Sequence, residues 1–464
     1  MSQRSTYYEA TPIHLTLDQR FYAPVTAASF PEHKLRFRNN RAAASVGLER
    51  LDDQSWINHF GKFTALPNNI ETPLALCYHG HQFGHYNPEL GDGRGFLFAQ
   101  MRSNDGRILD LGTKGSGQTP FSRTADGRLT LKGAVREILA TEMLEALGVN
   151  TSKTLSVIET GEELHRNDEP SPTRSAVLVR LSHSHIRIGS FQRLKFLDDS
   201  EGLEMLTRHT ARHYFADQLN ADDDLEVLVP ALLNAVSHAV ASTAGAWLAA
   251  GFVHGVLNTD NFNVTGESFD YGPWRFLPYF DPGFTAAYFD QTARYAYGRQ
   301  ADSCMWAMCR LADCFMNFCD EQTLQAQLQD FYPKMETSLA AGLARRLGVL
   351  PACDLNSGQE LCRQFFKLAR ASQAGFDQLL HDFWGGKQRR GNYAPDTIAG
   401  FANCLSDFVP AHNANHAFFD RATALSMTID DVEAIWDQIA ASDDWSALHQ
   451  KIEVVRDFGK ALLL

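Results

Sequence analysis

The sequence predicts a mixed α+β fold with two parts, a small β-rich part containing one helix and then a larger helical part. Before about residue 190, glycine-rich turns separate short apolar runs of the kind that form strands. After that point, apolar residues recur at the three- and four-residue spacing typical of helices. The 464 residues are enough for two or three domains, and a hydrophobic content of 44% is ordinary for a globular chain.

Four apolar runs in the first part predict strands, and one amphipathic stretch among them predicts a helix. The strand runs are residues 95–100, 108–112, 155–159 and 176–181, and the helix covers 132–147. In the second part, helices are predicted over 225–250, 304–318, 324–347, 360–371 and 429–441, with a loop-and-strand segment at 254–289. The predicted organisation is therefore an N-terminal extension (1–75), a β-rich domain (76–188) and a helical domain (189–464).

Composition excludes several classes of function. The 42 Lys and Arg against 55 Asp and Glu give a formal net charge of −13, which argues against a basic surface that coats nucleic acid or an anionic membrane. The apolar stretch 243–253 is about half of the roughly 20 residues that a membrane-spanning helix needs, and no secretory core is present at the N-terminus. The eight cysteines include no Cys-x-x-Cys pair. We therefore expect a soluble, cytoplasmic monomer with no nucleic-acid or membrane partner.

The first candidate motif is a glycine-rich turn, Gly91-Asp92-Gly93-Arg94-Gly95, directly before a predicted strand. Three glycines within five residues let the backbone approach an anion closely and donate its N–H groups to it. The same pattern is common in simple turns, and it matches neither the phosphate-binding Walker pattern nor the dinucleotide-binding pattern. By itself the motif leaves both interpretations open.

Four charged residues extend the pattern. Lys114 lies at the end of a predicted strand, and Glu137 follows 23 residues later on the predicted helix. Protein kinases use such a strand lysine and helix glutamate to hold nucleotide phosphates. Arg180 and Arg187, at and after the end of the last strand run, add guanidinium groups whose geometry suits phosphate oxygens. Taken singly, each of these charges could belong to an unrelated surface pair.

The decisive cluster is His254 and Asn261, seven residues apart, followed by Asp270-Tyr271-Gly272. It resembles the kinase catalytic loop His-x-Asp-x-x-x-x-Asn and the later Asp-Phe-Gly, whose Asn and second Asp bind Mg²⁺. Val256 stands where the kinase base should be, so Asp260 is the obvious replacement carboxylate. Taken in order, the motifs predict a protein-kinase-like two-lobe fold with a small β-rich N-lobe and a larger helical C-lobe.

Longer segments resemble the selenoprotein O (YdiU) family: residues 80–95, 122–128, 135–144, 179–189, 254–264 and 269–284. The resemblance covers about 76–315, and residues 320–464 are expected to be divergent. It implies a pseudokinase that binds ATP in a flipped orientation and transfers AMP to Ser, Thr or Tyr hydroxyls of proteins; UMP transfer is also attributed to the family. The alternatives are a kinase-like phosphotransferase that uses Asp260 as its base and an ATP-binding scaffold without turnover.

The resemblance also implies a role for each site residue. Asp260 would be the proton acceptor, and Asn261 and Asp270 would bind Mg²⁺ or Mn²⁺, with Asp270 also contacting ATP. The other residues implied in ATP binding are Gly91, Gly93, Arg94, Lys114, Asp126, Gly127, Glu137 (through Lys114), Arg180 and Arg187. With the nucleotide reversed, the α-phosphate would react and pyrophosphate would leave.

The chain also departs from the family. Members often carry a Cys or selenocysteine just before the C-terminus, paired with a Cys after the Asp-Tyr-Gly. This chain has Ala286 and Ala287 at the second place and ends in DFGKALLL, so we do not expect that redox switch. Four further side chains raise the alternative of a transition-metal site: Cys77, His79, His81 and His85. The glycine and proline among and after them disfavour the helix that would bring two of the histidines together.

Overall fold

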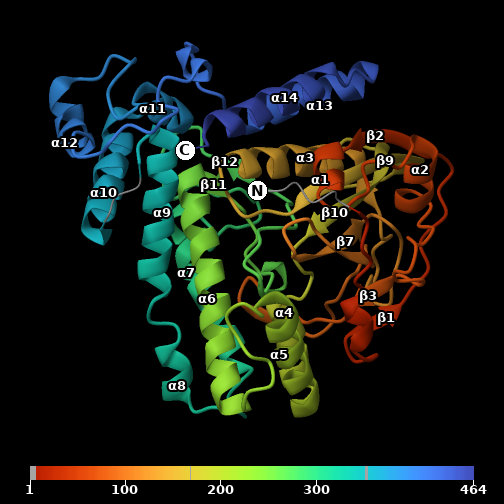
Figure 1. The fold of residues 1–464 in the computed structure, drawn as a ribbon. Coiled ribbons are helices and arrows are strands. Elements are labelled where there is room, and N and C mark those ends of the chain that lie inside the picture. Colours follow the sequence, from red (N-terminus) through yellow and green to blue (C-terminus); the bar gives the residue numbers. More distant parts are fainter. Residues whose placement is uncertain (1–6, 168, 351–353, 464) are drawn as a thin grey trace.

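The computed structural model of the protein describes residues 7–167, 169–350 and 354–463. Within these residues, an antiparallel sheet of eight strands lies beside a larger group of helices, which confirms the predicted α+β class (Figure 1). The sheet order is β1-β3-β6-β7-β10-β9-β2, and β8 pairs with β10. The strands are β1 (Tyr22–Pro24), β2 (Lys34–Arg38), β3 (Leu74–Leu76), β6 (Leu97–Arg102), β7 (Ile108–Lys114), β8 (Leu129–Thr130), β9 (Lys153–Leu164) and β10 (Thr173–Ser182).

The four strands predicted from apolar runs are β6, β7, β9 and β10, and they form the centre of the sheet. The first 75 residues, which the sequence left without a place, supply β1 and β2 at the two ends of the strand order. In register, Tyr22 pairs with Leu76, and Lys34 pairs with Glu159. The N-terminal segment is therefore an integral part of the same sheet.

Side chains that alternate along β10 bury both faces of the sheet. Val177 and Val179 pack on one face in a cluster with Trp56 and Phe60 of α2 (Asp53–Phe60), next to α1 (Asn40–Ala44). Leu178 faces the opposite side, in the cluster that contains α3 (Leu131–Ala146). The helix predicted over 132–147 is therefore α3, and it lies between the sheet and the rest of the molecule.

The second part is helical, as predicted, but its helices differ in detail. They are α4 (Ile188–Phe196), α5 (Ser200–Tyr214), α6 (Leu225–Ala250), α7 (Gln300–Asp313), α8 (Glu321–Ala326), α9 (Phe331–Leu347), α10 (Leu355–Ser372), α11 (Phe376–Asp382), α12 (Pro395–Leu405), α13 (Ile429–Ser442) and α14 (Ser446–Ala461). The single helix predicted over 324–347 is wrong, because α8 and α9 are separate. Pro333 lies in the first turn of α9, where its missing N–H is tolerated; inside one continuous helix it would remove a hydrogen bond.

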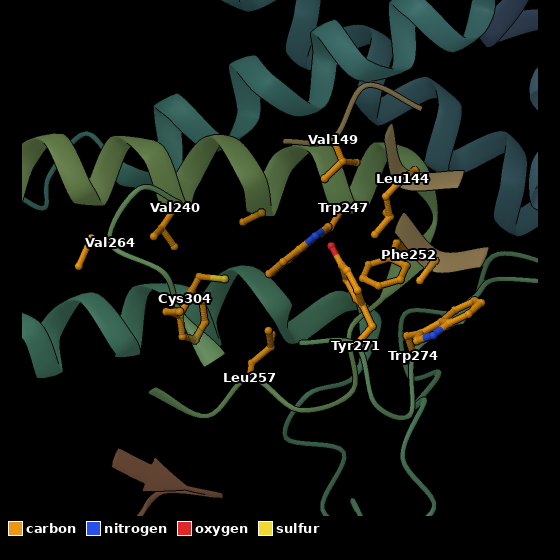
Figure 2. Packing of buried hydrophobic residues seen from close by; sticks show 14 of the residues in the cluster. Leu144, Val149, Val240, Trp247, Phe252, Leu257, Val264, Tyr271, Trp274 and Cys304 are labelled. Atoms are coloured by element: carbon orange, nitrogen blue, oxygen red, sulfur yellow. The ribbon is translucent and has the colours of Figure 1, made fainter. Parts of the chain in front are cut away.

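Helix α6 is the central helix of the second part and runs beside α9 (Figure 1). By length and composition alone it could cross a membrane, but 67% of its most apolar stretch is buried inside the protein, as in the core helix of a folded domain. Trp247 near its C-terminal end packs in the cluster with Phe252 and Tyr271 (Figure 2). The Trp247 indole N–H also donates to Ser268 Oγ at 3.0 Å. This packing fixes the segment 252–274, which includes β11 (Phe252–Val253) and the residues before β12 (Arg275–Phe276).

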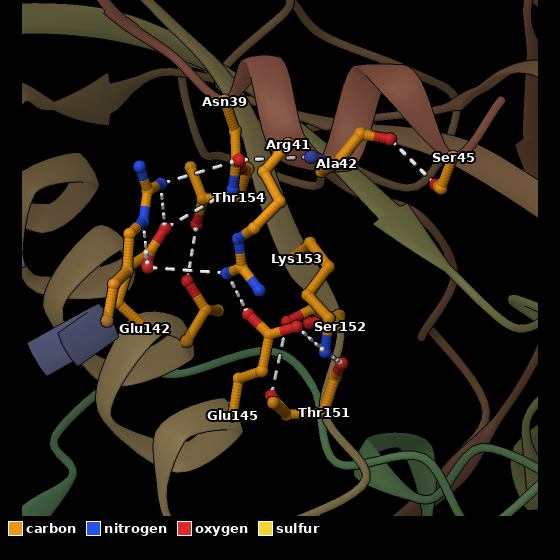
Figure 3. A network of polar contacts seen from close by, with 12 residues as sticks. Asn39, Arg41, Ala42, Ser45, Glu142, Glu145, Thr151, Ser152, Lys153 and Thr154 are labelled. Carbon is orange, nitrogen blue, oxygen red and sulfur yellow. Dashed lines mark hydrogen bonds and ion pairs between the residues drawn. The ribbon is translucent and has the colours of Figure 1, made fainter. Parts of the chain in front are cut away.

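A polar network holds the C-terminal part of α3, around Glu142 and Glu145 (Figure 3). Asn39 Nδ2 donates to Glu142 Oε1 at 3.2 Å, and Arg41 pairs with Glu145. Arg456 on α14 donates to both oxygens of Glu142, at 2.8 and 2.6 Å. Helix α14 lies along α3, so α3 is fixed between the sheet and the C-terminal helices. A buried carboxylate that accepts bonds from several donors gives this helix a defined position.

Candidate functional site

A cavity of about 320 Å³ lies where the glycine-rich turn, the end of β7 and the segment before β12 meet. Seven of the residues predicted from the sequence line it: Gly91, Gly93, Arg94, Lys114, Arg180, Arg187 and Asp270. Its other lining residues are Tyr78, Leu90, Asp92, Gly95, Thr113, Phe121, Ser122, Arg123 and Ala125. Tertiary structure thus brings together residues that are up to about 190 positions apart in the chain.

The predicted pairing of Lys114 with Glu137 is present. Lys114 ends β7, Glu137 lies on α3, and Lys114 Nζ is 2.8 Å from Glu137 Oε2. Both side chains are buried. Lys114 Nζ also lies 3.0 Å from Asp270 Oδ1, so one ammonium group bridges two carboxylates.

Asp270 contacts two cations of the sheet, Lys114 on β7 and Arg180 on β10. Arg180 Nη2 donates to Asp270 Oδ1 at 3.2 Å, and Arg180 Nε lies 3.4 Å from Glu137 Oε1. Burial by itself would raise the pKa of Asp270, but Lys114, Arg180 and Arg187 outweigh it and hold that pKa well below its usual value. The backbone of Asp270 is left-handed, with φ at +61°, a conformation that Asp adopts more readily than most residues. Asp270 is therefore an ionised carboxylate presented from a sharp turn.

Arg187 forms the other cationic wall. It precedes α4, and its Nη2 donates to Asp92 Oδ1 at 3.1 Å. Its Nη1 donates to the backbone oxygen of Asp260 at 3.2 Å, and its guanidinium lies over the Tyr78 ring at 4.3 Å. Arg187 therefore connects the glycine-rich turn with the loop that carries Asp260.

Some buried guanidinium N–H groups in this cavity have no protein acceptor. Within the described residues, Arg180 Nη1 and Arg187 Nε are buried and make no hydrogen bond. Buried polar groups in folded proteins are nearly always paired, so unpaired donors on side chains that line a cavity indicate a ligand with acceptor oxygens. Arginine N–H groups match phosphate and carboxylate oxygens in charge and geometry. The cavity is therefore suited to an anion.

The glycine-rich turn is required by close packing as well. A Cβ on Gly91 would stand 2.3 Å from the Phe121 ring, and one on Gly95 would stand 2.0 Å from the Thr113 carbonyl oxygen. Both glycines also line the cavity, so the tight-turn and anion-binding interpretations apply together. Arg94, between them, is exposed at the cavity rim.

Asp260 and Asn261 form a short turn, η2 (Thr259–Asn261), beside the cavity lining. Burial raises the pKa of Asp260 to about 6, and within the described part of the chain its Oδ1 has no hydrogen-bond partner. Asn261 Nδ2 donates to the Val256 carbonyl oxygen at 3.0 Å, which leaves the amide oxygen as an acceptor. Val256, which stands at the place of the kinase base, thus only accepts a hydrogen bond with its backbone oxygen, and the nearby carboxylate is that of Asp260.

Asp126 and Gly127 lie outside the cavity lining. Asp126 accepts from the Arg128 backbone N–H at 2.9 Å and pairs with Arg166 at 2.8 Å, on the wall of a separate surface cavity. Gly127 has φ at +70°, and a Cβ there would stand 2.3 Å from Gly117 backbone atoms. The structure therefore gives both residues a turn-building role, and their contact with nucleotide stays a prediction.

Two of the histidines considered as metal ligands, His81 and His85, lie on a β-hairpin, β4 (Gly80–Gln82) and β5 (His85–Asn87), and His79 directly precedes it. His81 pairs across it with Tyr86, and its backbone N–H donates to Thr259 Oγ1 at 2.7 Å. Across the residues that the structure describes, no group of three or more His, Cys, Asp or Glu side chains is arranged to hold a metal ion. The hairpin instead supports the loop that carries Asp260.

Among the lining residues to which the sequence analysis gave no role, two contact Arg187. Asp92, the ion-pair partner of Arg187, stands inside the recognised glycine motif, so its place there was a usable signal. Tyr78, whose ring lies against Arg187, follows β3 without any motif of its own.

An arginine-lined cavity beside a glycine-rich turn, with an ion-paired lysine and a turn carboxylate, is a class of site suited to phosphate groups. A sequence model of the family described as protein adenylyltransferase SelO matches residues 5–456. The chain belongs to this family, and the match extends well beyond residues 76–315, where the resemblance was seen first.

Three relatives show the extent of the similarity. A protein nucleotidyltransferase YdiU of Synechocystis sp. is 47% identical over 338 residues, which cover 72% of this chain and 69% of the relative. The protein of the same name from Trichormus variabilis is 38% identical over 470 residues, covering 96% and 95%. That from Vibrio cholerae is 33% identical over 379 residues, covering 82% and 75%.

Proposed function

We propose that this protein is an adenylyltransferase that transfers AMP from ATP to Ser, Thr or Tyr hydroxyls of proteins, with UTP as a second nucleotide donor. The observation that carries this proposal is that two arginines lining the cavity beside the glycine-rich turn each have, among the described residues, a buried guanidinium nitrogen without an acceptor, namely Arg180 Nη1 and Arg187 Nε. Family membership and the names of the relatives support the reaction class. We further propose that the protein has the two-lobed fold of a pseudokinase. We also propose that it is located in the cytoplasm.

In the proposed reaction, Lys114, Arg180 and Arg187 balance the charge of the phosphates and hold the α-phosphoryl group for in-line attack. The substrate hydroxyl oxygen forms a bond to the α-phosphorus, and its proton passes to the carboxylate of Asp260. The bond from the α-phosphorus to the bridging oxygen breaks, and pyrophosphate leaves. A carboxylate whose pKa is raised to about 6 is a stronger proton acceptor than an ordinary aspartate and is still ionised at pH 7.

A divalent cation, Mg²⁺ or Mn²⁺, is part of the proposal, and the residues present fit one. Asp270 is ionised, and Asn261 keeps its amide oxygen as an acceptor, so both offer the hard oxygen ligands that these ions prefer. When bound, the cation would neutralise phosphate charge and orient the leaving group. Lys114 and Arg180, which contact Asp270 in this structure, would then turn to phosphate oxygens.

The reaction class is tested by incubating the protein with a cell lysate, Mg²⁺ or Mn²⁺, and ATP labelled on either the α- or the γ-phosphate. Protein-bound label from the α-phosphate alone is expected, because AMP transfer keeps only that phosphorus. Label from the γ-phosphate alone would establish a phosphotransferase and contradict a reversed nucleotide. No label from either, with ATP binding retained, would establish the scaffold.

The ranking of two neighbouring residues is a second test. Lys114→Ala is expected to lower transfer by about 100- to 1,000-fold, since it removes a cation from the phosphates, and Glu137→Ala by about tenfold, since Glu137 only orients that cation. Initial rates of α-label transfer measure both variants. The control is Lys34→Ala, which breaks the exposed pair of Lys34 with Glu32 and should leave the rate unchanged. A larger loss in Glu137→Ala than in Lys114→Ala would contradict the assigned roles.

A further inference from the structure

Asp92, inside the glycine-rich turn, holds two different parts of the molecule with its two carboxylate oxygens. Its Oδ1 accepts from Arg187 Nη2 at 3.1 Å, and its Oδ2 accepts from the Leu76 backbone N–H at 3.1 Å. The Asp92 backbone N–H also donates to the Leu76 carbonyl oxygen at 3.1 Å. The side chain is buried, so these bonds are shielded from solvent. Asp92 is thus fixed to the last residue of β3, and its Oδ1 is bound to Arg187.

The guanidinium of Arg187 is restrained on several sides. It lies 4.3 Å from the centre of the Tyr78 ring and 5.1 Å from that of Phe269, and its Nη1 donates to the Asp260 backbone oxygen. Within the described residues, Asp92 is the one carboxylate with which Arg187 forms an ion pair. The third nitrogen of the guanidinium, Nε, is buried and has no hydrogen-bond partner there. Asp92 and the Asp260 carbonyl oxygen thus hold Nη2 and Nη1, and Nε is the guanidinium nitrogen without an acceptor among the described residues.

Two other carboxylates, those of Asp270 and Asp260, also lie close enough to Arg187 to help raise its pKa. In the proposed reaction these two are needed elsewhere, one for the divalent cation and one for the substrate proton. A guanidinium without Asp92 would be attracted to one of them, because an unpaired buried charge strongly favours the nearest opposite charge. The carboxylate of Asp92 is held by the Leu76 backbone N–H on β3, so its position does not depend on the loops of Asp260 and Asp270.

We infer that Asp92 is a positioning residue, which holds the Arg187 guanidinium in the cavity lining, where it can bind phosphate oxygens, and keeps it from pairing with the carboxylates of Asp260 and Asp270. The inference rests on the proposed nucleotidyl transfer. Asp92 acts only through Arg187 and does not need to touch the nucleotide. This role also accounts for an acidic residue within the Gly-Asp-Gly-Arg-Gly turn, because binding of an anion by the turn's backbone N–H groups would not require one.

The test is Asp92→Asn, whose amide oxygen can still accept from the Leu76 N–H but which offers no charge to Arg187. The turnover number for α-label transfer is expected to fall about 10- to 100-fold, the usual effect of displacing a group that orients a reacting one. The dissociation constant for ATP should change less than about threefold, because Arg187 keeps its charge. Asp92→Glu, which keeps the carboxylate, should retain more activity than Asp92→Asn. The matched control is Asp222→Asn, which breaks the exposed pair of Asp222 with Arg212 and should leave turnover unchanged.

A double-mutant cycle separates a positioning role from a merely structural one. In an Arg187→Ala background, Asp92→Asn should have no further effect on turnover, because the group through which it acts is gone. Independent, multiplying losses would overturn the inference, and so would wild-type turnover in Asp92→Asn or an equal loss of ATP binding, melting temperature and turnover. If the wild-type protein transfers no α-label, the proposed function fails by itself. A crystal structure of Asp92→Asn then decides the inference, since an unmoved Arg187 guanidinium would overturn it and a guanidinium turned to Asp260 or Asp270 would support it.

Discussion

Replacing Asp270 with asparagine is expected to lower AMP transfer at least about 1,000-fold, or roughly 4 kcal/mol of transition-state stabilisation. Asparagine has almost the same shape, so the change removes charge and little else. Asp270 Oδ1 lies 3.0 Å from Lys114 Nζ and 3.2 Å from Arg180 Nη2, so the variant loses the proposed cation ligand and unbalances two buried cations together. The rate of α-label transfer from ATP, at several Mg²⁺ and Mn²⁺ concentrations, measures the effect.

The control for this variant is Asp313→Asn, which breaks the surface pair of Asp313 with Arg310 and should transfer label at the wild-type rate. Circular dichroism of both variants establishes that they are folded. Transfer by folded Asp270→Asn within threefold of the wild-type rate would show that this carboxylate is not part of the reacting centre.

Replacing Asp260 with asparagine is expected to lower transfer about 100-fold, less than the loss at Asp270, because proton acceptance contributes less here than charge balance and alignment. The pH dependence gives a sharper test. Burial raises the pKa of Asp260 to about 6, and only the ionised carboxylate accepts a proton. In the wild-type protein, kcat/KM should therefore fall as the pH drops through about 6 and level off above it. In Asp260→Asn, this acid limb should disappear.

Rates between pH 5 and 8 at fixed ionic strength check this expectation. Asp457→Asn serves as the matched control, because Asp457 forms an exposed pair with Lys460 and neither residue lines the cavity. An acid limb that persists unchanged in Asp260→Asn would mean that another group accepts the proton.

Much of the fold could be predicted from local sequence patterns. The runs that became β6, β7, β9 and β10, and the stretches that became α3 and α6, carry the periodicity of their own secondary structure over many residues. The prediction failed at 324–347, where apolar spacing continues across the break between α8 and α9. It also left β1 and β2 without a place, because a short edge strand is recognised by the strand it pairs with and not by its own residues.

The residues of the candidate site likewise include some that the sequence predicted and some that it did not. Lys114 and Glu137 were predicted as a pair from their spacing on a strand and the next helix, and the structure places them 2.8 Å apart. The family resemblance implied Asp126 and Gly127 as further nucleotide contacts; they lie outside the cavity lining, within a turn of their own, and that contact stays a prediction. Tyr78 lines the cavity, and no motif of its own marks it.

The sequence by itself determined which residues could carry chemistry, because motif order and spacing express local backbone geometry. Only the tertiary structure decided which of them meet. Arg187 and Asp92 are 95 positions apart, and Arg456 and Glu142 are 314 apart, yet each pair is in hydrogen-bond contact. Such pairs depend on how the sheet, α3 and α14 pack, and packing is set by the burial of the whole apolar surface, which no short stretch of sequence specifies.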